Sequence, residues 1–259
     1  MKSLPDNDRQ ALQFKNVHFD YKNDAGHIPI LKDVSFSISK GEFVSIVGAS
    51  GSGKTTIFRL IVGLEQQRSG SIYIDGEQME KRLGKVGYMP QQDLLMPWRT
   101  IRQNAALPLE IQKQKSTDSN AVDRLLEEFG LEGYENKYPN ELSGGMRQRV
   151  SFLRATLSGS NVLLLDEPFS ALDAMTKLFM QEWLLEQWEK QSSTILFITH
   201  DISEALFLSD RIFIVTDTPF TTLEEVKVPL KRPRQQHHLD QKEVVELKNS
   251  LIERFRMRV

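Results

Sequence analysis

A glycine-rich stretch near residue 50 carries the residue types that hold phosphate. It consists of Gly48, Ala49, Ser50, Gly51, Ser52, Gly53, Lys54, Thr55 and Thr56, and it fits the pattern G-x-x-x-x-G-K-[ST]. Its glycines allow a tight turn that aims backbone N–H groups at an anion. This stretch, called the phosphate loop below, therefore predicts a site for a nucleoside triphosphate.

The segments on either side of the phosphate loop fit a strand before it and a helix after it. Residues 42–47 are apolar and β-branched, which is typical of a buried strand, and residues 56–62 are apolar at helical spacing. A helix that begins near Lys54 would add the positive end of its dipole to the site. The alternative is a Gly/Ser-rich turn that ends in Lys-Thr by chance, and this strand and helix argue against it.

The composition excludes several classes of protein. The chain has 259 residues, enough for one large domain or a core with a subdomain, and its formal net charge of −2 gives no general attraction to nucleic acid or anionic lipid. It has no cysteine, which excludes disulfides, thiolate zinc sites and cysteine nucleophiles. The first nine residues lack the apolar core of a signal peptide, and no apolar run approaches the roughly 18 residues that span a bilayer. We expect a cytosolic protein that reaches a membrane only through a partner.

The order of patterns along the chain predicts an α/β fold. Residues 12–21, 30–38 and 69–76 alternate as antiparallel strands do, whereas residues 161–168, 194–200 and 211–215 read as buried strands separated by helices at 174–191 and 202–208. Residues 84–100 begin as a strand and become a proline-bounded loop, and the patterns from 101 to 158 are helical. We expect one domain over 12–230 with a helical subdomain at about 92–158, and a tail over 231–259 with an amphipathic helix.

Seven short motifs occur in the order in which the ATP-binding subunits of ABC transporters have them. They are Tyr21, the phosphate loop, Gln91 (the Q-loop), Leu-Ser-Gly-Gly at 142–145 (the signature), the Walker B segment at 162–167, Ser-Ala-Leu-Asp at 170–173 (the D-loop) and His200 (the switch histidine). Each motif is weak alone, but their order makes the resemblance specific over residues 12–234. The resemblance implies a P-loop NTPase (RecA-like) core with an antiparallel β subdomain and an inserted α-helical subdomain.

The resemblance also implies how ATP and Mg²⁺ are held. Lys54 would contact the β- and γ-phosphates, and the hydroxyl of Thr55 would bind Mg²⁺ together with Gln91 and Asp166. Asp166 ends an apolar strand, where a carboxylate is costly unless it faces a cation. Thr56 either adds a phosphate contact or only starts the helix. The structural alternative for Asp166 is that it and Glu167 only cap the next helix.

Catalysis would then fall to Glu167, Gln91 and His200. Glu167 would orient or deprotonate the attacking water, and Gln91 and His200 would contact the γ-phosphate and its surroundings. A lone glutamine in a loop is usually solvated and a lone histidine at a strand end is usually structural, so both roles rest on the resemblance. Gln92 is the competitor for the Q-loop position, but Gln91 has the expected spacing of six residues to Pro97.

Tyr21 and two histidines of the C-terminal tail each have a structural alternative to a functional role. Tyr21 would stack on adenine, although it could be only a strand-edge aromatic, and Phe19 is its competitor. His237 and His238 stand in a basic, proline-containing tail, where we expect them to be solvated rather than metal-bound.

The signature predicts a second anion site. Ser143, Gly144 and Gly145 stand where a helix should begin, with Ser143 as its N-cap. One nucleotide could not use both this site and the phosphate loop of its own chain if the two lie on different subdomains. In the family, two subunits pack head to tail and each ATP lies between one phosphate loop and the signature of the other chain. We therefore expect a homodimer. Met146 stands where many members have glutamine, and the rest of the signature fits.

The surroundings of the motifs resemble one group within the family. Pro-Trp-Arg-Thr at 97–100, residues 228–234 and the lack of a regulatory domain after the core resemble the nitrate/sulfonate/taurine importers, and subunits for thiamine-precursor uptake look similar. The group implies an ATPase subunit at the cytoplasmic face of the membrane, which drives solute import through permease subunits and works indirectly with a solute-binding protein. The alternatives are the ATPase of an exporter and a soluble ABC-type ATPase of translation or DNA repair. The chain lacks the second cassette, the long coiled coil and the basic excess of the latter, so we expect no nucleic-acid partner.

Overall fold

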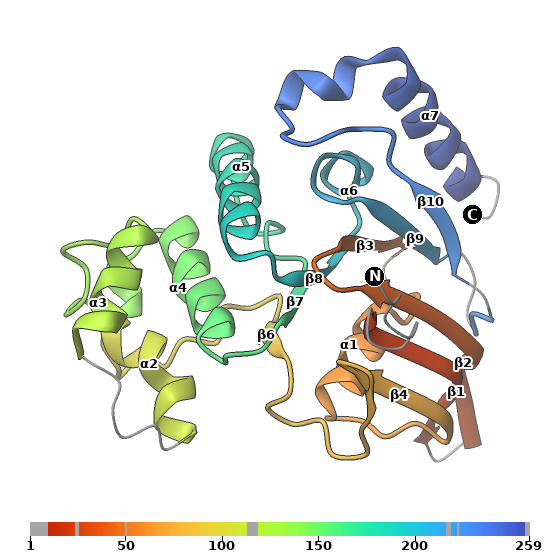
Figure 1. Cartoon of the computed structure of the whole chain (residues 1–259), viewed down its shortest axis with the longest axis horizontal. Coiled ribbons are helices and arrows are strands. Elements are labelled where there is room, and N and C mark those ends of the chain that lie inside the picture. Colours follow the sequence, from red (N-terminus) through yellow and green to blue (C-terminus); the bar gives the residue numbers. More distant parts are fainter. Residues whose placement is uncertain are drawn as a thin grey trace, which may run out of the picture.

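The computed structural model describes residues 10–23, 26–49, 51–112, 119–215, 219–221 and 223–256 (Figure 1). A six-stranded sheet runs through its centre. In spatial order its strands are β10 (Glu224–Lys227), β9 (Arg211–Val215), β3 (Phe43–Gly48), β8 (Thr194–Thr199), β7 (Val162–Asp166) and β6 (Gly87–Met89). All neighbours in it are parallel except β10, which pairs antiparallel with β9.

The central strands are apolar because both faces of this sheet are covered. Every residue of β3, β7 and β8 is buried, as expected for parallel strands with other elements packed on both sides. Their carboxyl ends meet at one edge of the sheet, which is where α/β folds bind ligands. The phosphate loop follows β3, His200 follows β8 and Asp166 ends β7, so all three lie at this edge on neighbouring strands.

A smaller antiparallel sheet lies beside the central one, and the first helix packs between the two sheets. Its strands, in the order β2–β1–β4–β5, are β2 (Gly26–Ser39), β1 (Gln10–Asn23), β4 (Ser69–Ile74) and β5 (Glu77–Gln78). α1 (Lys54–Val62) buries its apolar side chains in one cluster with residues of both sheets. Figure 1 shows α1 between the two sheets. The sequence predicts β1, β2 and β4 but not β5, and β1 and β2 are longer than the segments 12–21 and 30–38 that alternate.

Helices fill the chain between β6 and β7. They are α2 (Ile101–Ile111), α3 (Ser119–Glu128), the 3₁₀ turn η2 (Pro139–Glu141) and α4 (Gly144–Thr156). Val122, Leu126 and Phe129 are buried as their helical spacing predicts, and they share a second core cluster with α5 (Ala174–Gln191). In Figure 1 α2, α3 and α4 lie at the opposite end from the antiparallel sheet.

The C-terminal segment packs closely on the core. α7 (Lys242–Arg256) buries Val244 and Leu251 in a cluster with α6 (Ile202–Leu208), as its amphipathic pattern predicts. Sequence reasoning did not foresee β10, the 3₁₀ turn η3 (Gln236–Asp240) or the burial of Arg234. The Arg234 guanidinium donates to the carbonyls of Phe207 and Ser209 at 3.0 and 2.8 Å, so it satisfies the C-terminal end of α6. His237 is exposed, as expected, whereas His238 is half-buried and its Nδ1 accepts a hydrogen bond from the N–H of Gln235 at 3.1 Å.

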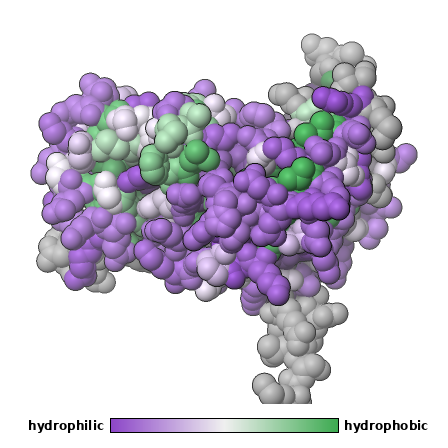
Figure 2. Space-filling view, turned by 90° about the horizontal axis from the view of Figure 1, so that it is seen from above, coloured by the Kyte–Doolittle hydropathy of each residue, from purple (hydrophilic) through white to green (hydrophobic). Residues whose placement is uncertain are grey.

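Hydrophobic side chains also reach the surface in several separate places. Figure 2 shows one face of the molecule, with hydrophobic areas among hydrophilic ones. Large apolar side chains that are more than half exposed include Leu94, Trp98, Ile111, Met175 and Phe179. Across the described residues no helix is long and apolar enough to cross a membrane.

A buried arginine holds the C-terminal end of α1. The Arg82 side chain is fully buried, and its Nε donates to the carbonyl of Leu60 at 2.7 Å. Its two other nitrogens donate to the carbonyls of Met79 and Glu65, at 2.7 and 3.2 Å. These bonds tie the last turn of α1 to the segment after β5, and α1 begins at the phosphate loop. Burial lowers the pKa of Arg82.

We expect Arg82→Met to lower the free energy of unfolding by roughly 2 to 4 kcal/mol, because it leaves several buried carbonyls without donors. Chemical denaturation measures this loss. Arg68→Met is the control, since Arg68 is 61% exposed and pairs with Asp20 at the surface, where an ion pair contributes less than about 1 kcal/mol. Equal losses for the two variants would contradict the role assigned to Arg82.

Candidate functional site

The phosphate loop turns directly from β3 into α1. Gly51 and Gly53 have φ of 80° and 90°, the left-handed region that glycine adopts without strain. A Cβ at Gly48 would lie 2.6 Å from the carbonyl oxygen of Val215 on the neighbouring strand β9, so only glycine fits there. Ser50 lies outside the described residues. The turn leaves the first N–H groups of α1 without partners inside the helix, which makes this end an anion site.

Lys54 lies under this loop with its charge enclosed. Its Nζ donates to the carbonyls of Gly48 and Ala49 at 2.8 and 2.6 Å, and the residue is 5% exposed. Burial lowers the pKa of Lys54, and the charges of Glu167 and Asp166 oppose that effect. The ammonium group therefore lies between the loop and the carboxylates at the end of β7, where it can neutralise a bound phosphate.

Asp166 is a buried carboxylate held by two hydroxyl groups. It is 4% exposed and accepts hydrogen bonds from the side chains of Thr55 and Tyr88. Burial, reinforced by the charge of Glu167, raises the pKa of Asp166 to about 6. Burial and the Asp166 charge raise the pKa of Tyr88 to about 12. A carboxylate desolvated in this way is stabilised by a cation, so the donor set of Asp166 and Thr55 fits a hard divalent ion bound beside phosphate.

Two predicted side chains, those of Gln91 and His200, converge on the carboxylate of Glu167. Its Oε2 accepts a hydrogen bond from Gln91 Nε2 at 3.3 Å and lies 3.2 Å from His200 Nδ1. Glu167 follows β7 with φ of 46°, and its N–H donates to Ile198 on β8 at 2.9 Å. The Glu167 side chain is 19% exposed and that of His200 is 62% exposed. This carboxylate therefore keeps partial access to solvent just after β7, where it can receive a proton from water.

The signature begins α4, as predicted. Ser143 is the N-cap of that helix, and its Oγ accepts from the N–H of Met146 at 3.3 Å. A Cβ at Gly145 would lie 2.9 Å from Thr176 Cγ2, so α4 and the first turn of α5 approach closely here. Within the described ranges no hydrogen bond or ion pair joins Ser143–Gly145 to the phosphate loop, and Figure 1 places α4 and α1 in different parts of the molecule. The N-terminal ends of α1 and α4, the two predicted anion sites, are therefore separate in one chain.

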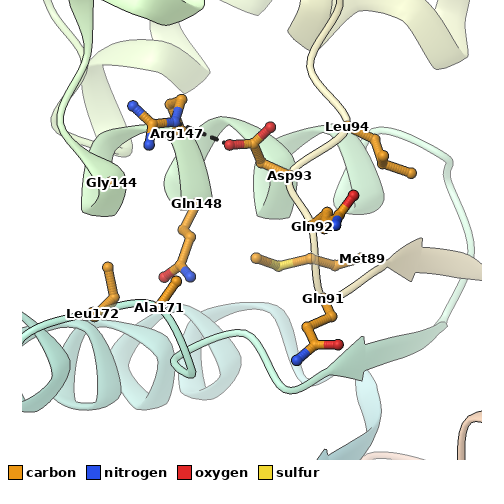
Figure 3. Close-up of a pocket in the computed structure, with 10 residues that line it drawn as sticks. All are labelled: Met89, Gln91, Gln92, Asp93, Leu94, Gly144, Arg147, Gln148, Ala171 and Leu172. Carbon is orange, nitrogen blue, oxygen red and sulfur yellow. Dashed lines mark hydrogen bonds and ion pairs between the residues drawn. The ribbon is translucent and has the colours of Figure 1, made fainter.

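A cavity lies between the Q-loop, the start of α4 and the D-loop (Figure 3). Its volume is about 430 Å³, and its lining includes Gln91, Asp93, Arg147, Gln148 and Leu172. Figure 3 shows Gln148 pointing from α4 toward the D-loop. Arg147 pairs with Asp93 at 3.0 Å, which fixes the Q-loop to the signature helix. The residues that would sense phosphate are thus mechanically joined to the signature.

The predicted adenine contact lies at the edge of the antiparallel sheet. Phe19 is 5% exposed and belongs to the core, whereas Tyr21 is half-buried beside it, with the two rings in an edge-to-face contact at 4.8 Å. Only Tyr21 of this pair has surface to offer to a base. This arrangement favours the residue that the sequence analysis prefers.

The family is decided by a comparison of the sequence with family models. Residues 31–170, more than half of the chain, match the model described as ABC transporter. The chain belongs to the ABC transporter family. It is the ATP-binding subunit of such a transporter and an ATPase, and the P-loop NTPase core expected for an ABC ATPase is confirmed.

Relatives of known role and solved structures agree with this assignment. The chain is 49% identical to the formylaminopyrimidine import ATP-binding protein ThiZ of Halalkalibacterium halodurans, over 85% of this chain and 86% of the relative. It is 42% identical to the aliphatic sulfonates import ATP-binding protein SsuB of Bacillus cereus, over 83% and 84%. The solved dimer of the ATP-binding cassette MJ0796, in a post-hydrolysis state with ADP and Pi, matches with a TM-score of 0.74 and 32% identity, over 85% of this chain and all of that one.

One residue of this ABC ATPase site was missed by sequence reasoning. Tyr88 lies on β6, beside β7, and its hydroxyl reaches Asp166. A signal was present, because Tyr88 stands three residues before Gln91 in a strand that the pattern already indicated. Its partner could not be known without the pairing of β6 with β7.

Proposed function

We propose that two copies of this chain hydrolyse ATP at shared sites and thereby drive the import of a small solute through separate membrane subunits. The observation that carries the catalytic part is the convergence of Gln91 and His200 on the Glu167 carboxylate. Glu167 takes a proton from the attacking water, and the other two residues place that water against the γ-phosphate. Geometry supports this role because the three residues come just after β6, β7 and β8, at the same edge of the central sheet.

The phosphates are held by the phosphate loop, with Lys54 neutralising the β- and γ-phosphates. Thr55, Gln91 and Asp166 are the proposed ligands of Mg²⁺, which fits their oxygen donors and the burial of Asp166. Bound Mg²⁺ would offset the charge that develops on the phosphate oxygens. The chain's own part is to keep Asp166 ionised and oriented, which the hydroxyl donors Thr55 and Tyr88 do.

Two copies are proposed because each chain carries half of two sites. The N-terminal end of α4, with Ser143, Gly144 and Gly145, is an anion site distant from the phosphate loop of its own chain. A head-to-tail dimer would place it on the γ-phosphate of the other copy. The dimeric state of the related cassette MJ0796 supports this arrangement.

Tyr21 is proposed to stack on adenine, and this gives a testable loss of affinity. We expect Tyr21→Ala to raise the Kd for ATP about 5- to 150-fold, the equivalent of roughly 1 to 3 kcal/mol for one stacked base. Tyr21→Phe should keep most of the affinity. Tyr73→Ala, on β4 of the same sheet, is the control. Fluorescence titration with a labelled ATP measures all three, and equal Kd values for Tyr21→Ala and Tyr73→Ala would contradict the assignment.

The names of the relatives support a proposal for the direction of transport and the class of solute. One named relative imports formylaminopyrimidine and another aliphatic sulfonates. We propose import of a small solute of one of these two kinds, with formylaminopyrimidines favoured by the higher identity to ThiZ. The subunit would act at the cytoplasmic face of the membrane, bound to permease subunits that receive solute from a binding protein. Exposed Leu94 and Trp98 next to the Q-loop offer a surface for the permease.

Reconstitution in proteoliposomes with a permease that binds this subunit, together with its solute-binding protein, tests this proposal. ATP hydrolysis in proteoliposomes should rise when the binding protein is loaded with a formylaminopyrimidine, and solute should accumulate inside. Stimulation by an alkanesulfonate alone would move the chain to the sulfonate group. Stimulation by neither solute, with a permease that folds and binds the subunit, would contradict both assignments.

A further inference from the structure

The first turn of α5 touches the signature helix on one side and the switch region on the other. Asp173, the last residue of the D-loop, is the N-cap of α5 and accepts from the N–H groups of Met175 and Thr176 at 3.1 Å each. Thr176 faces Gly145 of the signature, where a Cβ would lie 2.9 Å from its Cγ2. The next residue is Lys177, which points toward α6.

Lys177 binds two carboxylates that follow the switch histidine. Its Nζ lies 2.9 Å from Asp201 Oδ2 and 2.6 Å from Glu204 Oε1. The Lys177 and Glu204 side chains are 26% and 6% exposed, so this ion pair is largely removed from solvent. A buried carboxylate needs such a partner, since burial and the neighbouring charge of Asp201 raise the pKa of Glu204, whereas Lys177 opposes that rise.

The two carboxylates in turn hold the backbone on both sides of His200. Asp201 accepts from the N–H of Ser203 at 2.8 Å as the N-cap of α6. Glu204 accepts a hydrogen bond from the hydroxyl of Thr199, and that hydroxyl accepts from the N–H of Asp201 at 3.0 Å. Thr199 and Asp201 are the neighbours of His200 in the chain. One ammonium group therefore fixes the strand end before His200 and the helix start after it.

We propose that Lys177 is a positioning residue for His200: it ties the D-loop end of α5 to the backbone around the switch histidine and keeps the imidazole at Glu167. The side chain of His200 is 62% exposed, and its only ion-pair contact among the described residues is Glu167 Oε2 at 3.2 Å. The position of the imidazole therefore depends on how firmly the backbone around His200 is held. The inference rests on the proposed role of His200 in hydrolysis. It adds a residue that touches neither nucleotide nor water.

The competing explanation is that Lys177 only stabilises the fold. The two explanations differ in what they predict for kinetics. Replacing a residue that only stabilises the fold changes the amount of folded enzyme. Replacing a residue that positions His200 lowers kcat and leaves the affinity of the phosphate loop for ATP unchanged. Displacement of a catalytic group by about 1 Å costs on the order of 100-fold in rate.

The test compares kcat and KM for ATP in Lys177→Met, Lys177→Arg and Lys190→Met. Lys190 lies on the exposed face near the end of the same helix and serves as the matched control. We expect Lys177→Met to lower kcat about 10- to 100-fold with KM within about 2-fold of the wild type. Lys177→Arg, which keeps the charge, should restore most of kcat. Wild-type kcat in folded Lys177→Met, or a loss of the same size in Lys190→Met, would overturn the proposal.

A double variant separates positioning from stability. Lys177→Met/Glu204→Gln removes both charges of the buried pair, so its thermal stability should return toward that of the wild type while kcat stays low. If Lys177→Met alone does not fold, the kcat of the double variant is measured in its place. Recovery of kcat together with stability would overturn the proposal. His200→Ala and Glu167→Gln are measured in the same assay. If both variants keep their turnover, the proposed hydrolysis mechanism is contradicted. If both lose turnover but Lys177→Met keeps it, only the role of Lys177 is contradicted.

Discussion

Replacing Glu167 by glutamine is expected to lower ATP turnover about 100- to 10,000-fold, the usual contribution of a general base. Glutamine keeps the shape of the side chain and a hydrogen-bonding oxygen for Gln91, but it cannot take a proton from water. ATP binding should be retained, because Lys54 and the phosphate loop are unchanged. Steady-state phosphate release measures the turnover, and fluorescence titration measures the binding.

Glu189→Gln is the matched control for this variant. Glu189 lies exposed near the end of α5, away from the phosphate loop, so its replacement should leave turnover unchanged. Unchanged hydrolysis in Glu167→Gln would remove Glu167 from its role and return the pair at 166–167 to the alternative of a structural helix cap.

The second large effect is expected at the signature. Ser143→Arg should abolish hydrolysis, because it removes the N-cap of α4 and fills the anion site with a long side chain. Binding of ATP to a single chain should persist, since the phosphate loop lies elsewhere. Wild-type ATPase activity without membrane partners should also rise faster than linearly with protein concentration, because two chains must meet to complete a site.

Asn140→Arg controls for the added charge. Asn140 is exposed in the turn just before the signature, and its replacement should leave hydrolysis within about 2-fold of the wild type, as for a surface substitution. A loss of ATP binding in Ser143→Arg, or a strictly linear dependence of rate on concentration, would contradict a site made by two chains.

The central sheet could be predicted from the sequence because each of its main strands has a local hydrophobic pattern. β3, β7 and β8 are predominantly apolar and each leads into a polar motif, and parallel strands bring those motifs to one edge. Ser143 as a helix N-cap could also be predicted, because capping depends on residues three apart. The ends of β1 and β2 could not, because pairing rather than local pattern extends them.

What the sequence could not provide are contacts between residues far apart in the chain. Tyr88 reaches Asp166 only because β6 lies beside β7, and Lys177 reaches Glu204 only because α5 lies beside α6. Arg234 looks like one of several exposed basic residues in the tail, yet it is buried against the carbonyls that end α6. In each case a charged or polar side chain owes its partner to tertiary packing, for which a single sequence carries no pattern.

The shared site is tested most directly by the mass of Glu167→Gln in solution with and without ATP. Because ATP would bridge the phosphate loop of one chain and the signature of the other, sedimentation should show a dimer with ATP and a monomer with ADP. Adding Ser143→Arg to the same chain should abolish the dimer while ATP still binds. A monomer in saturating ATP, or a dimer that survives Ser143→Arg, would contradict the account.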